Sequence, residues 1–260
     1  MPDPASRARA LLRLQTGPRI LVLANVWDVT SARVVAGTAG TGALATASHS
    51  IAASLGYEDG ERIPLDLHLD VVRRITAAVD LPVSVDLEAG YGDPGGTAQR
   101  AIAAGAVGGN LEDGMRPLDE AVAAVGEVLV AGRAAGLDFV LNARTDAVLH
   151  APDGADRAAL LDEAVRRGRA FLAAGAAAVF VPGVAAAAEI AALVEALGRG
   201  RLSVLAVPGA TPPVAELERL GVARVSTGPF AQRVALTALQ DATAALLAGG
   251  ALPPGTRMLS

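Results

Sequence analysis

The 260-residue chain contains no cysteine and no lysine. Without cysteine it can form no disulfide, no thiol nucleophile and no cysteine-ligated zinc site. Without lysine it can form no side-chain Schiff base, cannot anchor pyridoxal phosphate and cannot complete a phosphate-binding P-loop. Apart from the histidines, every basic side chain is therefore an arginine, and covalent catalysis through a side-chain thiol or amine is excluded.

Histidine and net positive charge are also scarce. The three histidines, His49, His68 and His150, are far apart and form no HExxH pair, and the sequence has no GxSxG nucleophile motif. The formal net charge is −5 and the pI is about 5.2, which argues against a surface for nucleic acid or anionic membrane. Residues 1–19 contain no apolar stretch with a cleavage site, so we expect a cytoplasmic protein without a signal peptide.

Hydrophobic residues make up 52% of the sequence, and many of them fall into short apolar runs separated by helical segments. Eight runs have the length and composition of strands buried on both faces. They are residues 20–24, 42–46, 82–87, 107–111, 139–143, 177–181, 202–207 and 223–226. Alternation of eight such strands with helices predicts a single α/β domain over residues 1–260, a parallel (β/α)8 TIM-type barrel, with an open doubly wound sheet as the alternative.

Several residues mark the expected ends of helices. Asp28 is placed to cap a helix that begins near residue 29, and Pro94 occupies the first position of another helix. Gly105 and Gly221 each follow an expected helix, at the position where a left-handed residue commonly ends it. The last helix is expected at about residues 230–247.

Polar side chains collect where the second to fifth strands end. Asp86 and Glu88 lie two residues apart at the end of the third strand, so in an extended chain they point to the same face. The other strand ends carry Thr46, Ser48 and His49, then Asn110, Glu112 and Asp113, then Asn142, Arg144 and Asp146. In a (β/α)8 barrel these ends meet on one side and form the active site.

The acidic members of this set predict a divalent metal site. Asp86, Glu88 and Glu112 offer the hard oxygen ligands that Mg2+ prefers, with Mn2+ as the alternative metal. Because Mg2+ usually takes only one or two carboxylates directly and keeps several waters, some of them are expected to act through water. Arg144 presents a planar guanidinium suited to a carboxylate. A metal beside an arginine predicts a small anionic oxo acid as substrate.

Other patterns receive structural interpretations. Residues 90–95 match the G-x-G-x-x-G pattern of dinucleotide-binding loops, but the two carboxylates before it would repel a pyrophosphate. We interpret this stretch as a tight turn that lets the substrate approach the backbone. His68 is expected to be a surface or packing residue, and Arg166 and Arg167 are expected to be surface charges of a helix.

Over most of its length the chain resembles the isocitrate lyase/phosphoenolpyruvate mutase superfamily. The resemblance is carried by residues 46–48, 54–59, 85–92, 109–113, 142–146, 208–209 and 224–229. It implies a (β/α)8 barrel whose eighth helix is often swapped between the subunits of a homodimer or homotetramer. It also implies Mg2+ and a small 2-oxo or 2-hydroxy acid that reacts through an enolate intermediate.

The same resemblance implies roles for charged residues. Asp86, Glu88 and Glu112 correspond to the metal-site carboxylates, and Asp59 to an aspartate that contacts the substrate or a metal-bound water. Arg144 corresponds to the substrate arginine, which we count among both the catalytic and the substrate-binding residues.

Small polar residues complete the predicted site. Ala47, through its backbone, and Ser48 correspond to a cradle for the substrate carboxylate. From their places at strand ends we add Thr46 and Asn110 as substrate-binding residues and His49 as a catalytic residue.

The loop after the fourth strand departs from the superfamily pattern and narrows the reaction. Lyases of isocitrate-type substrates carry a catalytic cysteine in a lysine-rich gating loop, and the phosphonate-processing branch uses a lysine and an asparagine there. Residues 113–120 are short and contain none of these. We therefore expect a carbon–carbon lyase, such as an oxaloacetate decarboxylase, and not a cysteine-dependent isocitrate lyase. Phosphonopyruvate-type C–P chemistry and a metal-dependent aldolase are the alternatives, followed by a non-catalytic binding barrel.

Overall fold

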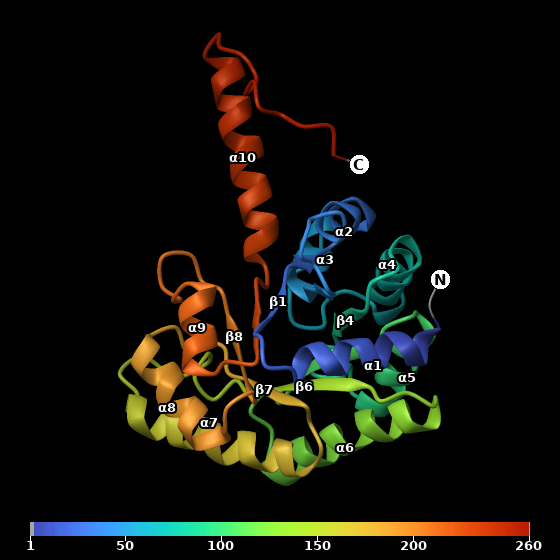
Figure 1. Ribbon diagram of the computed structural model, residues 1–260, viewed down its shortest axis with the longest axis vertical. Helices are drawn as coiled ribbons and strands as arrows, with labels where there is room; N and C mark the ends of the chain where they lie inside the picture. Colours follow the sequence, from blue (N-terminus) through green and yellow to red (C-terminus); the bar gives the residue numbers. More distant parts are fainter. Residues whose placement is uncertain (1–2, 260) are drawn as a thin grey trace.

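In the computed structural model, which describes residues 3–259, a parallel β-barrel is surrounded by helices (Figure 1). Nine strands form one sheet in the order β1-β9-β8-β7-β6-β5-β4-β3-β2, and each recorded pairing is parallel. The strands are β1 Leu21–Leu23, β2 Asn25–Val26, β3 Leu44–Thr46, β4 Val83–Asp86, β5 Gly108–Glu112, β6 Val140–Arg144, β7 Ala178–Phe180, β8 Leu202–Leu205 and β9 Arg224–Ser226.

The barrel closes through its first strand, which is interrupted only at Ala24. β1 pairs with β9, with Leu21 opposite Arg224, and β2 pairs with β3, with Asn25 opposite Ala45. The two ends of the sheet are therefore consecutive pieces of one extended segment. Eight strand positions close on themselves, which confirms the (β/α)8 barrel and rules out the open doubly wound sheet.

Ten helices lie in the described part of the chain. They are α1 Pro4–Gln15, α2 Val29–Ala36, α3 Ser48–Ser54, α4 Leu65–Ala78, α5 Pro94–Ala103, α6 Leu118–Ala134, α7 Arg157–Ala173, α8 Ala187–Leu197, α9 Val214–Leu220 and α10 Phe230–Leu247. None of them combines the length and the hydropathy that crossing a membrane requires.

The expected helix ends are confirmed. Asp28 accepts the backbone N–H of Ser31 at 2.6 Å in a capping box at the start of α2, and Pro94 is the first residue of α5. Gly105 and Gly221 have φ angles of +96° and +97°, which a residue with a side chain rarely adopts.

Residues 48–62, which by composition are expected to form a polar loop, begin with the helix α3. Ile51 and Ala52 of this helix are buried and form a small hydrophobic cluster with Ile63. The helix has only two turns, which is too short for a clear apolar period in the sequence. It carries Ser48 at its first position, next to the end of β3.

The interior of the barrel is polar and connected by hydrogen bonds. Asn142 donates to Asn110 at 2.8 Å, and the hydroxyl of Ser203 donates to Asn142 at 2.7 Å. Arg224 is 1% exposed and donates to the hydroxyl of Ser84 at 3.3 Å. The hydrophobic core instead lies between the barrel wall and its helices, largely α4 to α8.

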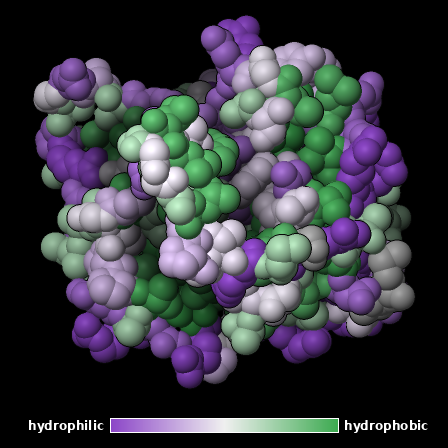
Figure 2. All heavy atoms as spheres, turned by 90° about the horizontal axis from the view of Figure 1, so that it is seen from above, coloured by the Kyte–Doolittle hydropathy of each residue, from purple (hydrophilic) through white to green (hydrophobic). Residues whose placement is uncertain are grey.

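The final helix, α10, projects away from the barrel (Figure 1). Gln232 is its only buried residue, while its large apolar side chains, among them Val234, Leu239 and Leu247, are exposed. The view from above in Figure 2 shows hydrophobic surface among hydrophilic groups on the face from which α10 projects. Exchange of this helix between subunits remains a prediction.

Candidate active site

A cavity of about 310 Å³ lies at the carboxyl ends of the strands. Seven of the ten predicted site residues line it: Ala47, Ser48, His49, Asp59, Asp86, Asn110 and Arg144. Thr46, Glu88 and Glu112 are not among its lining residues. The barrel topology thus brings most of the predicted set together at one end, as the strand-end pattern indicates.

Asp86, the last residue of β4, is held by the start of α3. Its Oδ2 atom accepts hydrogen bonds from the backbone N–H of Ser48 at 3.2 Å and from the Ser48 hydroxyl at 2.8 Å. The same hydroxyl lies 3.4 Å from Oδ1 of Asp59. Thr46 holds the backbone of the same residue, because its hydroxyl accepts the N–H of Asp86 at 3.0 Å. Thr46 is therefore placed to support Asp86 and is not exposed to the cavity.

The prediction that Asp86 and Glu88 share one face of a strand is wrong, because β4 ends at Asp86. Glu88 has a φ angle of +49°, in the left-handed region, so the two-residue alternation stops before it. Its buried carboxylate accepts the hydroxyl of Tyr91 at 2.7 Å and the backbone N–H of Glu61. Burial raises the pKa of Glu88 to about 7, and the hydrogen bond from Tyr91 opposes this rise.

Glu112 and Arg144 face each other because β5 and β6 pair in register at these residues. Nη1 of Arg144 lies 2.7 Å from Glu112 Oε2, and its Nε donates to Asp146 Oδ1 at 2.7 Å. Burial raises the pKa of Glu112 to about 8 although Arg144 favours the charged form, and the like charges of Asp146 and Asp86 add to the rise. This end of the barrel therefore holds more negative charge than its arginine neutralises.

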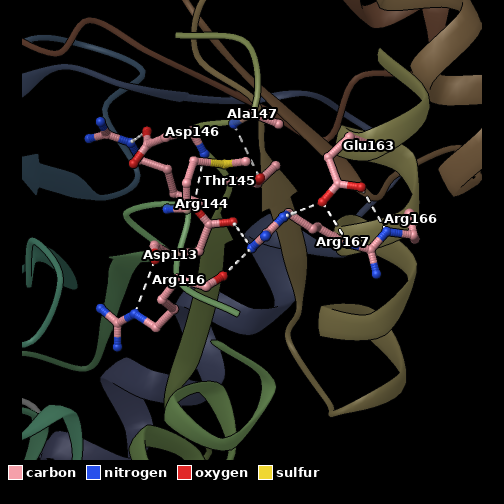
Figure 3. Close-up of polar contacts among 10 residues, drawn as sticks. Asp113, Arg116, Arg144, Thr145, Asp146, Ala147, Glu163, Arg166 and Arg167 are labelled. Carbon is pink, nitrogen blue, oxygen red and sulfur yellow. Dashed lines mark hydrogen bonds and ion pairs between the residues drawn. The ribbon is translucent and has the colours of Figure 1, made fainter. Parts of the chain in front are cut away.

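The interpretation of Arg167 as a surface charge is also wrong. Arg167 is 5% exposed, and its Nη1 atom lies 3.0 Å from Oδ2 of Asp113 (Figure 3). Its neighbour Arg166 is exposed and contacts only Glu163, as expected. Sequence periodicity alone could not tell which of the two arginines is buried. Adjacent helix positions point only about 100° apart, so both can lie near the boundary between the buried and the exposed side.

Residues that the sequence interpretation missed also line the cavity. They include Asn25, Phe180, Leu205, Phe230 and Arg233. Asn25 directly follows the first predicted strand, residues 20–24, so the strand-end rule applied to the other strands could have found it. Arg233 belongs to the first turn of α10, and no local pattern marks it as a site residue.

Asn25 links the ends of β3 and β9, the two strands that pair with the interrupted first strand of the barrel. Its Nδ2 donates to the carbonyl of Thr46 at 2.6 Å, and its Oδ1 accepts the backbone N–H groups of Thr227 and Gly228 at 2.9 and 2.8 Å. These bonds fix the turn that leads into α10. The position of the cavity wall near Gly228 therefore depends on the side-chain amide of Asn25.

Comparison with known proteins identifies the family. Residues 11–247 match the family described as phosphoenolpyruvate phosphomutase. The chain belongs to this family. The resemblance to the isocitrate lyase/phosphoenolpyruvate mutase superfamily is thereby confirmed, and the (β/α)8 barrel described above is the fold that it implies.

Individual members of the superfamily carry several activities. An oxaloacetate decarboxylase from Bradyrhizobium sp. (strain BTAi1 / ATCC BAA-1182) is 29% identical over 95% of this chain and 87% of its own. A provisionally assigned phosphonomutase from Burkholderia cenocepacia J2315 superposes with a TM-score of 0.85 at 41% identity, over 95% of this chain and 100% of that one. The structure of an oxaloacetate acetylhydrolase with the product oxalate superposes with a TM-score of 0.84 at 26% identity, over 98% and 91%.

We expect Asn25→Ala to lower the free energy of unfolding by about 2 kcal/mol, because it leaves a buried carbonyl and two N–H groups unpaired. Urea denaturation of the variant and the wild type measures this difference. Asn25→Asp keeps the acceptor oxygens but loses the donor to Thr46, so it should also destabilise the protein. Wild-type stability of both variants would contradict the assigned role of Asn25.

Proposed function

We propose that this member of the phosphoenolpyruvate phosphomutase family is a Mg2+-dependent carbon–carbon lyase of a small 2-oxo diacid, and specifically that it decarboxylates oxaloacetate. The observation that carries the proposal is a single cavity lined by two carboxylates, Asp86 and Asp59, and by two guanidinium groups, Arg144 and Arg233. The names of the relatives support the substrate, since a decarboxylase and an acetylhydrolase among them are both named for oxaloacetate.

The donor set at this end of the barrel fits Mg2+. Asp86, Glu88 and Glu112 are oxygen donors, the type of ligand that Mg2+ prefers. Burial is the largest cause of the raised pKa values of the two glutamates, and the like charge of Asp86 adds to it. Within residues 3–259, no three His, Cys, Asp or Glu side chains converge closely enough to hold one ion. A Mg2+ ion here would therefore be bound directly by only one or two carboxylates and otherwise by water. Asp86, which lines the cavity, would be a direct ligand, and Glu88 and Glu112 would act through water.

Two arginines around the cavity suit a substrate with two carboxylates. Arg144 is clamped by Glu112 and Asp146 and so holds one fixed orientation, which favours binding of the 2-oxo carboxylate. Arg233 stacks on the ring of Phe230, 5.2 Å from its centroid, and has no carboxylate partner in the part of the chain described. We assign Arg233 to the second carboxylate. The backbone of Ala47 and the hydroxyl of Ser48 complete the cradle for the first carboxylate, and Asn110 adds a polar contact.

In the proposed reaction, the C3–C4 bond of oxaloacetate breaks, C4 leaves as CO2, and the electron pair of the bond remains on the pyruvate fragment as an enolate. Bound Mg2+ would polarise the 2-oxo group and favour negative charge on its oxygen. Arg144 would bind the 2-oxo carboxylate and so orient the substrate in the cavity. The enolate then takes a proton at C3 from a water or an acid near His49 and Asp59, both of which line the cavity.

Phosphonopyruvate-type chemistry is the second candidate, because the neighbour with 41% identity is provisionally assigned as a phosphonomutase. The short loop at residues 113–120, which contains no lysine, argues against it. The two reactions require different leaving groups, so one panel of substrates separates them.

We also propose a homodimer or homotetramer in which the exposed apolar side chains of α10 pack against a second copy of the chain. A neighbouring subunit would then cover the side of the barrel that α10, by projecting outward, leaves uncovered. A cytoplasmic location is part of the same proposal.

We expect purified protein with Mg2+ to convert oxaloacetate to pyruvate and CO2 faster than Mg2+ alone. Coupled detection of pyruvate, with mass analysis of the products, measures this. Release of oxalate and acetate would instead assign hydrolysis, and turnover of phosphonopyruvate would assign the second candidate. If none of the three substrates reacts, the proposed reaction is wrong.

Asp86→Asn should weaken binding of Mn2+, used as a probe for Mg2+, by more than about 10-fold, because loss of even an outer-shell partner commonly costs about 10- to 100-fold. Titration followed by electron paramagnetic resonance measures free Mn2+. Asp119→Asn, on the exposed side of α6, is the matched control and should bind Mn2+ normally. Unchanged affinity in Asp86→Asn would overturn the metal assignment.

Arg233→Met should raise the KM for oxaloacetate by about 10-fold or more, because it removes a charged hydrogen bond to the second carboxylate. Pyruvate, which lacks that carboxylate, should inhibit the variant and the wild type equally. Steady-state kinetics with pyruvate as competitor test both points. If pyruvate binding weakens as much as oxaloacetate binding, Arg233 does not recognise the second carboxylate.

A further inference from the structure

A buried ion pair lies directly behind the cavity and is not part of its lining. It joins Arg167, in the middle of α7, to Asp113, the first residue after β5, with 3.0 Å between Nη1 and Oδ2 (Figure 3). The side chains are 6% and 1% exposed. Removing two charges from water is costly, and such pairs often add little net stability. Stability alone is therefore a poor explanation for this pair.

Asp113 uses both of its carboxylate oxygens. Oδ2 accepts a hydrogen bond from Arg167. Oδ1 accepts the backbone N–H of Met115 at 3.0 Å and the backbone N–H of Asp146 at 3.1 Å. Met115 belongs to the loop after β5, and Asp146 belongs to the loop after β6. One buried carboxylate therefore holds two neighbouring strand-end loops together.

The connection continues from Asp146 into the cavity. Oδ1 of Asp146 accepts Nε of Arg144 at 2.7 Å, and Nη1 of Arg144 lies 2.7 Å from Glu112, which precedes Asp113 in the chain. These contacts form a closed circuit through Asp113, Asp146, Arg144 and Glu112. The orientation of Arg144 thus depends on the position of the Asp146 backbone, which Asp113 fixes.

Arg167 also ties down the rest of the loop after β5. Its Nη1 donates to the carbonyl of Arg116 at 2.9 Å, and its Nε donates to Glu163 at 2.6 Å. Arg116 in turn donates to the carbonyls of Asp113 and Ala89 at 3.0 and 2.8 Å. Residues 113–116 are therefore bonded to α7 and to the segment that follows β4.

We propose that Arg167 and Asp113 are positioning residues that fix Arg144 in the cavity and hold residues 113–116 as a rigid wall. Arg167 acts through Asp113 and the backbone of Asp146 and does not touch the substrate. The effect on substrate binding rests on the role proposed above for Arg144. The effect on the two loops does not depend on that role.

The test compares Arg167→Met with Arg166→Met. Both substitutions remove an arginine of α7 that contacts Glu163, but only Arg167 reaches Asp113. Hydrogen exchange should become at least about 10-fold faster in peptides covering residues 113–116 and 144–147 of Arg167→Met, because local opening then needs less free energy. Arg166→Met should exchange like the wild type in these peptides.

Calorimetric titration with oxalate in the presence of Mg2+ gives a second readout. The affinity of Arg167→Met should fall by about 10-fold, the size of a typical outer-shell effect. With oxaloacetate, KM should rise while kcat changes little, because the lost positioning affects bound ground and transition states alike. If wild-type protein fails to bind oxalate, the proposed function fails, and hydrogen exchange still decides the positioning role.

Asp113→Asn provides a variant of nearly the same shape in case Arg167→Met does not fold. An amide has one acceptor oxygen, whereas Asp113 uses two, so either orientation of the amide loses Arg167 or the two backbone N–H groups. We expect the same faster exchange and weaker oxalate binding. If folded Asp113→Asn matches the wild type in both readouts, or if Arg166→Met and Arg167→Met behave alike, the proposal is wrong.

Discussion

The crowding of carboxylates at one end of the barrel is the constraint on which the surrounding structure depends. Asp86, Glu112, Asp146 and Asp113 all lie at the ends of three adjacent strands, where the first two are half-buried and the last two are buried. Buried like charges raise one another's free energy unless each finds a donor or a cation. Asp86 accepts hydrogen bonds from Ser48. Glu112 pairs with Arg144, and Asp113 pairs with Arg167. The loops that follow these strands are therefore built around an end of the barrel that is already charged.

Strand register decides which charges meet. In parallel strands the residues at equal heights become neighbours, so the pairing of Glu112 with Arg144 follows from the register of β5 and β6. The same register places Asn110 beside Asn142 one layer deeper, where a hydrogen bond replaces the ion pair. Polarity therefore continues from the cavity into the barrel interior, down to Arg224, whose pKa burial lowers to about 10. At that value the guanidinium remains charged at neutral pH and offers a deep counter-charge to Asp86.

The sequence predicted what depends on periodicity and on chain order. Eight buried strands, their parallel arrangement and the gathering of residues such as Asp86 and Arg144 follow from alternation and from the rule for strand ends. What it could not predict depends on dihedral angles and on contacts distant in sequence. The left-handed φ of Glu88 ends the strand pattern without a glycine to signal it. Arg167 looks like its neighbour Arg166 until the fold brings Asp113, 54 positions away, against one of them.

The absence of lysine bears directly on these buried pairs. A lysine ammonium in the place of Arg167 would be a compact point charge whose pKa burial readily lowers. The guanidinium of Arg167 directs donors in a fixed plane to Asp113, Arg116 and Glu163 at once. Arg144 uses the same planar geometry to bridge Glu112 and Asp146. Because each arginine serves several acceptors, two of them can organise two loops and one side of the cavity. The use of arginine in place of lysine, which removes amine catalysis from this chain, thus also explains how its charged end is kept in one arrangement.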